Sequence, residues 1–175
     1  MTYCNHAEAY FEEWSSHLSK KGWLDYLYNT YGEFKLAFAS LDKDGNPFWS
    51  KHHPYQEIRD DQRFIECANN RTILESELVL DLEQPDQLIP TIAKLHEENV
   101  YTYSVFKTGS RGYHIHIFNP VFQESINPKA RKLKEHIIRK IGADPAKASN
   151  KAMIALEFAP HWKTGKTKEY VENGV

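Results

Sequence analysis

The succession of apolar patterns between residues 77 and 142 constrains the fold of this chain more than any other feature. Residues 77–83, ELVLDLE, form a continuous apolar run that is typical of a buried strand, and residues 86–98 have helical spacing. Residues 101–118 contain two extended runs around a glycine-containing loop, and a second helix follows from Asn127 until Gly142 ends it. Together with a later strand, AMIALEF, this order predicts an α+β domain with helices packed on one side of a mostly antiparallel sheet.

The N-terminal half has less regular patterns. Residues 7–31 have the spacing of a helix, with apolar stripes that break at Gly22. Residues 34–52 contain two extended runs around a turn, which predicts a β-hairpin in which Gly45 supplies a positive φ. A short helix is expected at about residues 60–68.

The length of 175 residues fits one domain, in which residues 77–168 carry the motifs and residues 1–76 form an N-terminal part. A hydrophobic content of 41% with 26% charged residues is ordinary for a globular protein. Because no apolar run approaches about 18 residues, a soluble protein without a membrane partner is expected. The start, MTYCNHAEAYFEEW, lacks the basic and apolar segments of a secretory signal, so we expect a cytoplasmic location.

Charge and cysteine content narrow the functional class. Cys4 and Cys67 are the only two cysteines, which supports neither a disulfide framework nor a structural zinc site. The net charge is −2, but from residue 105 onward 13 Lys and Arg stand against 6 Asp and Glu. This basic half can face phosphates, or it can be a solvated helix face, because residues 129–140 supply six of those thirteen charges.

Two carboxylates stand at alternate positions of the predicted strand, at Asp81 and Glu83. Alternate residues of a strand point to the same face, so the two carboxylates are expected close together. Like charges at that separation repel unless a cation lies between them, and hard oxygen ligands favour magnesium or manganese. A solvent-facing acidic pair without a ligand is the alternative interpretation.

The glycine-containing loop, TGSRGYHIH at residues 108–116, offers several groups that bind anions. Its two glycines allow close backbone approach, Ser110 adds a hydroxyl donor, and Arg111 adds a guanidinium suited to phosphate. His114 and His116 are again two residues apart and share a strand face. The same segment is also compatible with an ordinary hairpin turn and packed histidines.

A third polar segment, HWKTGK at residues 161–166, follows the AMIALEF strand. It lacks the first glycine of a Walker motif and precedes no clear helix, so it is not a P-loop. Its His161, Lys163 and Lys166 can still contact a triphosphate or a template backbone, although an exposed surface loop has the same composition.

Taken in this order, the three segments resemble the archaeo-eukaryotic primase superfamily of primase small subunits and primase-polymerases. The first motif of that family is a hydrophobic strand with two acidic residues one apart, matched by Asp81 and Glu83. The second ends in a small residue, any residue and histidine, matched by Gly112-Tyr113-His114. The third is an acidic residue upstream of a segment similar to HxKTG, matched by Asp144 before HWKTGK.

The resemblance implies a DNA primase or polymerase that transfers nucleotides from nucleoside triphosphates onto a DNA primer and template. It implies a sheet similar to an RNA-recognition motif, with an N-terminal α/β extension on the other side of the cleft. Two Mg²⁺ or Mn²⁺ ions would be held by Asp81, Glu83 and Asp144. The residues that would contact the triphosphate or template are Ser110, Arg111, Gly112, His114, His116, His161, Lys163 and Lys166. A helicase or a primase large subunit would be a protein partner.

Three alternatives remain open from the sequence. Glu157 in IALEF competes with Asp144 as the third carboxylate, because Asp144 lies beside Pro145. The His-Ile-His pattern also resembles the metal ligands of replication-initiator nucleases, although Tyr170 has neither the helix nor the following lysine that those enzymes use. An inactive relative that only binds nucleic acid or a partner is the third. Neither de novo priming nor the choice of ribo- or deoxyribonucleotides follows from the sequence.

Overall fold

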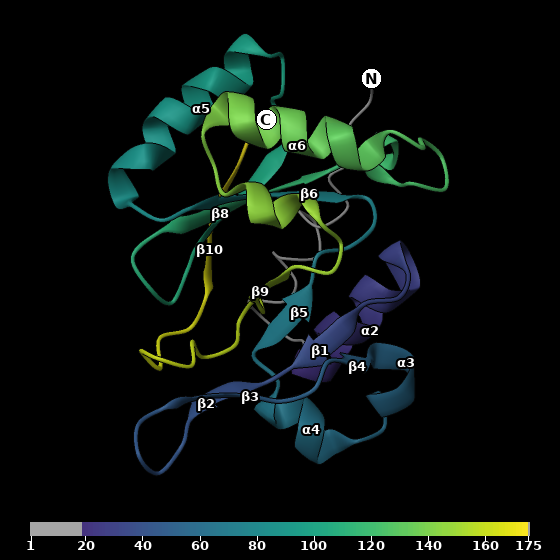
Figure 1. Cartoon of the computed structure of the whole chain (residues 1–175), viewed down its shortest axis with the longest axis vertical. Coiled ribbons are helices and arrows are strands. Elements are labelled where there is room, and N and C mark those ends of the chain that lie inside the picture. The colour runs from purple at the N-terminus through teal and green to yellow at the C-terminus, as the bar shows by residue number, and fades with distance from the viewer. Residues whose placement is uncertain (1–18, 175) are drawn as a thin grey trace.

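The computed structural model describes residues 19–174 of the chain. Within them the chain forms three antiparallel sheets and several helices (Figure 1). The strands are β1 Lys35–Ala37, β2 Ala39–Leu41, β3 Pro47–Trp49, β4 His53–Pro54, β5 Asn70–Thr72, β6 Glu77–Leu82, β7 Tyr103–Lys107, β8 Tyr113–Phe118, β9 Met153–Ala155 and β10 Glu169–Gly174. The α-helices are α2 Lys20–Tyr31, α3 Tyr55–Ile58, α4 Gln62–Cys67, α5 Leu88–Glu97 and α6 Ala130–Ile141, and the 3-10 helices are η1 Pro85–Gln87, η2 Pro120–Phe122 and η3 Pro145–Ala148. The predicted α+β class is confirmed.

The larger sheet has the strand order β10-β7-β8-β6. Figure 1 shows α5 and α6 lying together over one face of this sheet. The alternation of β6 explains this arrangement, because Leu78, Leu80 and Leu82 all belong to the core that includes Leu95 of α5 and Ile138 of α6. The polar residues of β6 are therefore left for the opposite face.

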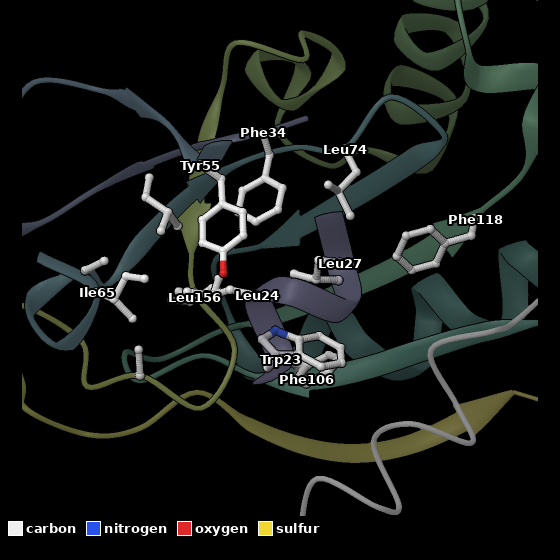
Figure 2. Close-up of a cluster of buried hydrophobic side chains, with 13 residues drawn as sticks. Trp23, Leu24, Leu27, Phe34, Tyr55, Ile65, Leu74, Phe106, Phe118 and Leu156 are labelled. Atoms are coloured by element: carbon white, nitrogen blue, oxygen red, sulfur yellow. The ribbon is translucent and has the colours of Figure 1, made fainter. Parts of the chain in front are cut away.

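That opposite face is covered by the N-terminal part of the chain. Figure 2 shows Trp23 of α2 close to Phe106 of β7, and α2 running between the sheet and the stacked rings of Phe34 and Tyr55. Phe118 of β8 belongs to the same buried cluster. The sheet thus has an apolar core on each face, and helices lie on both sides of it, so the predicted packing of helices on one side alone is wrong.

A second sheet, ordered β4-β1-β5-β9, combines N-terminal strands with a strand from the C-terminal half. The expected hairpin is present as β2 and β3, with Gly45 at a φ of +80° in its turn. The AMIALEF segment forms only the short strand β9, and a turn follows at Glu157 and Phe158, where φ of Phe158 is +61°. Glu157 therefore lies beyond the strand that was expected to carry it.

Helix boundaries follow local capping. Within the described residues the first helix begins at Lys20, where the Ser19 hydroxyl accepts a hydrogen bond from the Gly22 N–H at 3.1 Å. The expected break at Gly22 is therefore wrong, and residues 7–18 of the predicted helix lie outside the described part. Helix α6 ends as predicted, at Gly142 with a φ of +86°.

No helix within residues 19–174 is both long enough and apolar enough to cross a membrane.

Candidate functional site

A cleft of about 430 Å³ lies where the end of β6, the β7–β8 loop, the β2–β3 hairpin and the loop after β9 meet. Seven residues that the sequence singled out line it: Asp81, Glu83, Ser110, Arg111, Gly112, His114 and His161. They come from all three of the predicted segments, which are up to 80 residues apart in the chain. Side chains from the N-terminal half, including Asn69 and Asn70, complete the wall.

The pairing of β6 with β8 brings the first two segments together. Asp81 lies directly opposite His114 in this antiparallel register. Gly112 closes the loop against the end of β6, where a Cβ atom would overlap the carbonyl oxygen of Leu82. Only glycine permits this approach, so the loop reaches the carboxylates because of its sequence.

Asp81 is held in a positively charged environment. Its carboxylate lies 3.4 Å from Nε2 of His114 and 3.7 Å from Nζ of Lys147, and its side chain is 23% exposed. Burial alone would raise the pKa of Asp81, but the hydrogen bond to His114 and the charge of Lys147 outweigh burial and lower it. Asp81 is therefore ionised at neutral pH and can ligate a cation.

His114 is the buried histidine of the cleft. Burial lowers its pKa to about 4, and the positive charge of Lys168 acts in the same direction. The ring is therefore neutral at pH 7. Its Nδ1 atom is buried and has no hydrogen-bond partner among the described residues. Because Nε2–H of the neutral ring faces Asp81, Nδ1 carries no proton and is a buried acceptor.

The HWKTGK loop packs directly on the glycine loop. The Thr164 hydroxyl donates a hydrogen bond to the carbonyl of Gly109, where a Cβ atom would overlap the backbone of Lys166. The His161 N–H donates to the Lys166 carbonyl at 2.8 Å, which closes the loop on itself. His161 therefore lines the cleft, whereas the exposed side chains of Lys163 and Lys166 are not among the lining residues.

Asp144 lies beside the acidic pair although a hairpin and a helix separate them in sequence. A neighbouring pocket of about 350 Å³ is lined by Asp81, Glu83 and Asp144 together. The Asp144 N–H donates to the Asp81 carbonyl at 3.4 Å, and its carboxylate accepts from the Ala146 N–H at 3.0 Å. The three carboxylates share a pocket, but their oxygens do not form a group within 4.8 Å of one another.

Glu157, the rival third carboxylate, belongs to a different site. It lies in a buried network between the two larger sheets with Arg71 of β5, Glu77 of β6, His116 of β8 and Lys168. Arg71 binds both carboxylates, with distances of 2.8 and 2.9 Å to Glu77 and 2.7 and 3.0 Å to Glu157. Lys168 Nζ lies 3.3 Å from Glu157 and 3.1 Å from Nε2 of His116.

The network is electrically balanced. Burial would raise the pKa values of Glu77 and Glu157, but the Arg71 charge lowers both well below the usual range. Burial lowers the pKa of Lys168 to about 8. Burial and Lys168 lower the pKa of His116, so this ring is neutral, accepting at Nε2 from Lys168 and donating from Nδ1 to Glu77. Two carboxylates thus face two cations.

The position of His116 differs from the sequence prediction. His116 shares a strand face with His114, with 5.9 Å between the ring centroids, but it does not line the cleft. Glu77, His116 and Glu157 offer ligand atoms within 4.8 Å of one another and can in principle hold a metal ion. Both carboxylates already bind Arg71, however, so a further cation would have to displace it.

Several cleft residues were not predicted from the sequence. Lys147 approaches Asp81 because η3 follows directly after Asp144, and a basic residue soon after an acidic motif was the available signal. Trp49 and Trp162 also line the cleft. No local pattern places these two tryptophans together, since they come from a hairpin and a loop more than 100 residues apart.

Comparison with known proteins adds no family assignment. No protein-family model matches the chain, and no curated protein matches it significantly. The functional assignment therefore depends on the residues of the cleft and on the motifs that they represent.

Proposed function

We propose that this protein is a metal-dependent nucleotidyltransferase of the primase-polymerase type. One observation carries the proposal: three short motifs, distant in sequence, meet at a single cleft that has carboxylates on one wall and phosphate-binding groups on another. Phosphoryl transfer needs both kinds of group, because carboxylates hold the metal ions that neutralise phosphate charge and donor groups bind the phosphate oxygens. Solvated surface pairs and ordinary turns have no reason to converge in this way.

The donor set suits magnesium or manganese. Asp81, Glu83 and Asp144 offer only carboxylate oxygens to their shared pocket, and hard divalent cations prefer such ligands. When bound, two such ions would neutralise the phosphates and activate the attacking hydroxyl. Oδ1 of Asp144 accepts from the Ala146 N–H, which leaves Oδ2 as the oxygen that would ligate an ion.

The phosphate-binding wall consists of the glycine loop and His114. In the proposal, Ser110, Arg111 and the loop amides hold the triphosphate, with Gly112 permitting close approach. In the proposal, the single N–H of the neutral His114 ring, on Nε2, donates to a phosphate oxygen once metal ions take up the Asp81 carboxylate that it faces in this structure. His161 contributes from the third segment, while Lys163 and Lys166 lie outside the cleft and contact the backbone of the DNA strand.

The fold provides a frame for this chemistry. We propose that β6, α5, β7, β8 and α6 form a core similar to an RNA-recognition motif, to which β10 is added beside β7. The N-terminal α/β part then forms the other side of the active-site cleft, which Asn69 and Asn70 support by lining it. DNA primer, template and nucleoside triphosphates are the proposed partners, and a helicase or primase large subunit is a proposed protein partner.

The nuclease alternative receives less support from the geometry. A metal held by His-Ile-His needs a free nitrogen from both rings, but both nitrogens of His116 are engaged by Glu77 and Lys168. Tyr170, its candidate nucleophile, lies in strand β10 and packs against Phe106. An inactive relative is less favoured because the carboxylates remain together in one pocket.

Primer extension tests the proposal. The purified chain should add nucleotides to a primed DNA template with Mg²⁺ or Mn²⁺ and should add none in excess chelator. A triphosphate brings about four negative charges to a site with carboxylates, so the complex is strongly opposed without cations. Extension in chelator would contradict the mechanism. DNA binding without synthesis would indicate the inactive relative, and a covalent tyrosine–DNA adduct would indicate the nuclease.

Alanine variants of His114 and His116 should have different effects. His114→Ala should weaken nucleoside triphosphate binding about ten- to hundredfold, because a hydrogen bond to a charged group contributes about 1.5–3 kcal/mol. His116→Ala should leave binding by the folded protein unchanged but lower the free energy of unfolding, since Glu77 and Lys168 lose a buried partner. Calorimetric titration and urea denaturation measure the two effects. Equal binding losses, with metal binding abolished, would favour the His-Ile-His metal site instead.

A further inference from the structure

Two tryptophans meet at the rim of the cleft. Trp49 of β3 and Trp162 of the loop after β9 have ring centroids 5.8 Å apart at an interplanar angle of 66°, and both line the cleft that contains Asp81. In Figure 1 the β2–β3 hairpin and the loop between β9 and β10 reach toward the same side of the molecule. The aromatic rim is therefore continuous with the proposed active site.

The hairpin holds Trp49 in place. Trp49 pairs with Ala39 across the hairpin, and the Asn69 side chain exchanges two hydrogen bonds with the Ala39 backbone, each 2.8 Å long. Trp49 nevertheless remains 45% exposed. A large aromatic ring that is fixed in place yet left in water at a cleft is suited to stacking on a flat ligand.

The charge around the rings favours an anionic ligand. Nζ of Lys163 lies 4.8 Å from the centroid of the Trp162 ring, and the uncharged His161 ring stacks on the same tryptophan, with 6.2 Å between the two centroids. Lys166 is exposed on the same loop. Aromatic faces flanked by cations are the combination that binds single-stranded nucleic acid, because bases stack while phosphates pair with lysines.

We infer that Trp49 and Trp162 form a base-stacking subsite for a single DNA strand as it enters the cleft. This inference rests on the proposed function, because only a polymerase site at the carboxylates gives a DNA strand a reason to run from the rim into the cleft. We take a strand as the occupant because the exposed side chains of Lys163 and Lys166 extend the positive charge beyond the residues that line the cleft, where successive phosphates of a strand can pair with them.

Phe48 supplies a matched control on the same strand. It is 48% exposed, close to the 45% of Trp49, but it does not line the cleft and instead contacts Phe38, with ring centroids 5.7 Å apart. Removing Phe48 therefore tests damage to the hairpin without removing the subsite. A general loss of hairpin structure would affect both variants equally.

The test is anisotropy of a labelled dT octamer titrated with protein in excess chelator, where no catalysis occurs. The double variant Trp49→Ala/Trp162→Ala should bind at least about fivefold more weakly than wild type, as expected for losing one stacked base. Phe48→Ala should bind like wild type, and Trp49→Phe/Trp162→Phe should retain most of the affinity. An octamer with abasic sites should bind wild type and the double variant with the same low affinity.

Unchanged affinity of the folded double variant for the dT octamer would overturn the inference. Equal affinity of wild type for the abasic and normal octamers would overturn it too. If the double variant instead loses affinity only for dTTP, titrated with Mg²⁺ and without primer or template, the rings serve the nucleotide and the strand subsite is wrong. Because neither titration involves catalysis, these outcomes do not depend on primer extension. Extension by wild type with unchanged octamer binding by the double variant would remove this inference and leave the proposed function intact.

Discussion

Asp81→Asn should abolish metal-dependent primer extension, with a loss of more than about a hundredfold. Outer groups that merely orient metal ligands already contribute about 10- to 100-fold, and Asp81 is proposed to ligate the ions itself. The amide keeps the shape of the side chain but removes the negative charge that attracts the cation. Because Asp81 also contacts His114 and Lys147, it links the metal to the phosphate-binding wall.

The fold of this variant should survive, because Asn keeps an acceptor that faces the His114 N–H and only the partly exposed 3.7 Å contact with Lys147 loses its charge. Circular dichroism and thermal melting serve as folding controls. Asp86→Asn is the matched control, since Asp86 is an exposed carboxylate in η1 that lines neither pocket of the acidic pair. Robust extension by folded Asp81→Asn, or an equal loss in Asp86→Asn, would exclude Asp81 as a metal ligand.

Arg71→Met should destabilise the protein by about 3–5 kcal/mol, the range for removing one partner of a buried ion pair. Arg71 is 1% exposed and is the cation that binds both Glu77 and Glu157. Without it, Lys168 would be the cation left in the network for two buried carboxylates, because the His116 ring is neutral. Since a typical domain has about 5–15 kcal/mol of stability, much of the total would be lost. Urea denaturation monitored by fluorescence measures the change.

Two further variants test the cause of that loss. Arg59→Met removes an arginine that is 38% exposed and pairs with Asp25, so it should cost at most about 1 kcal/mol. Arg71→Met/Glu157→Gln should be more stable than Arg71→Met, because one uncompensated charge is gone. If Arg71→Met is as stable as Arg59→Met, the buried network does not make the contribution to the free energy of unfolding that its burial predicts.

Acid provides an independent measurement of the same network. The folded-state pKa values of Glu77 and Glu157 lie below the ordinary carboxyl value of 4.5, so their contribution is present above that pH. Their contribution to the free energy of unfolding is lost as the pH falls below 4.5 toward their folded-state pKa values, because the unfolded state takes up protons first. Wild type should therefore lose stability below about pH 4.5. Arg71→Met should lack this part of the decline, because its carboxyl groups no longer have lowered pKa values.

Much of the fold was predictable because its elements have local signals. The run ELVLDLE gave β6, the helical spacing after it gave α5, and Gly142 ended α6 as expected. The second sheet was not predictable, because β5 pairs with β1 about 35 residues before it and with β9 more than 80 residues after it, and each of these strands has only three residues. A strand of three residues is too short to show the alternation of apolar and polar residues that identifies a strand in a sequence.

The candidate site also has a part that could be predicted from local motifs and a part that could not. Asp81, Glu83 and His114 stand in local motifs, and their meeting in one cleft follows from the hairpin and its register. The role of Glu157 could not be predicted, because its partner Arg71 on β5 stands 86 residues earlier in the chain and buried arginine has no local signature. Sequence alone therefore identified which residues were polar and clustered, but not which of two carboxylates a buried cation would neutralise.

The alternation along β6 also governs which strand pairing is allowed. Glu77 and Asp81 point to one face, while Leu78 and Leu80 point to the core beneath α5 and α6. A slip of one residue against β8 would turn both carboxylates into that apolar core, where neither Arg71 nor His114 can reach them. The residues proposed for catalysis and for the buried network thus also act against misregistered sheets. Replacing either carboxylate by an apolar residue would lower the penalty that separates the native pairing from its slipped neighbour.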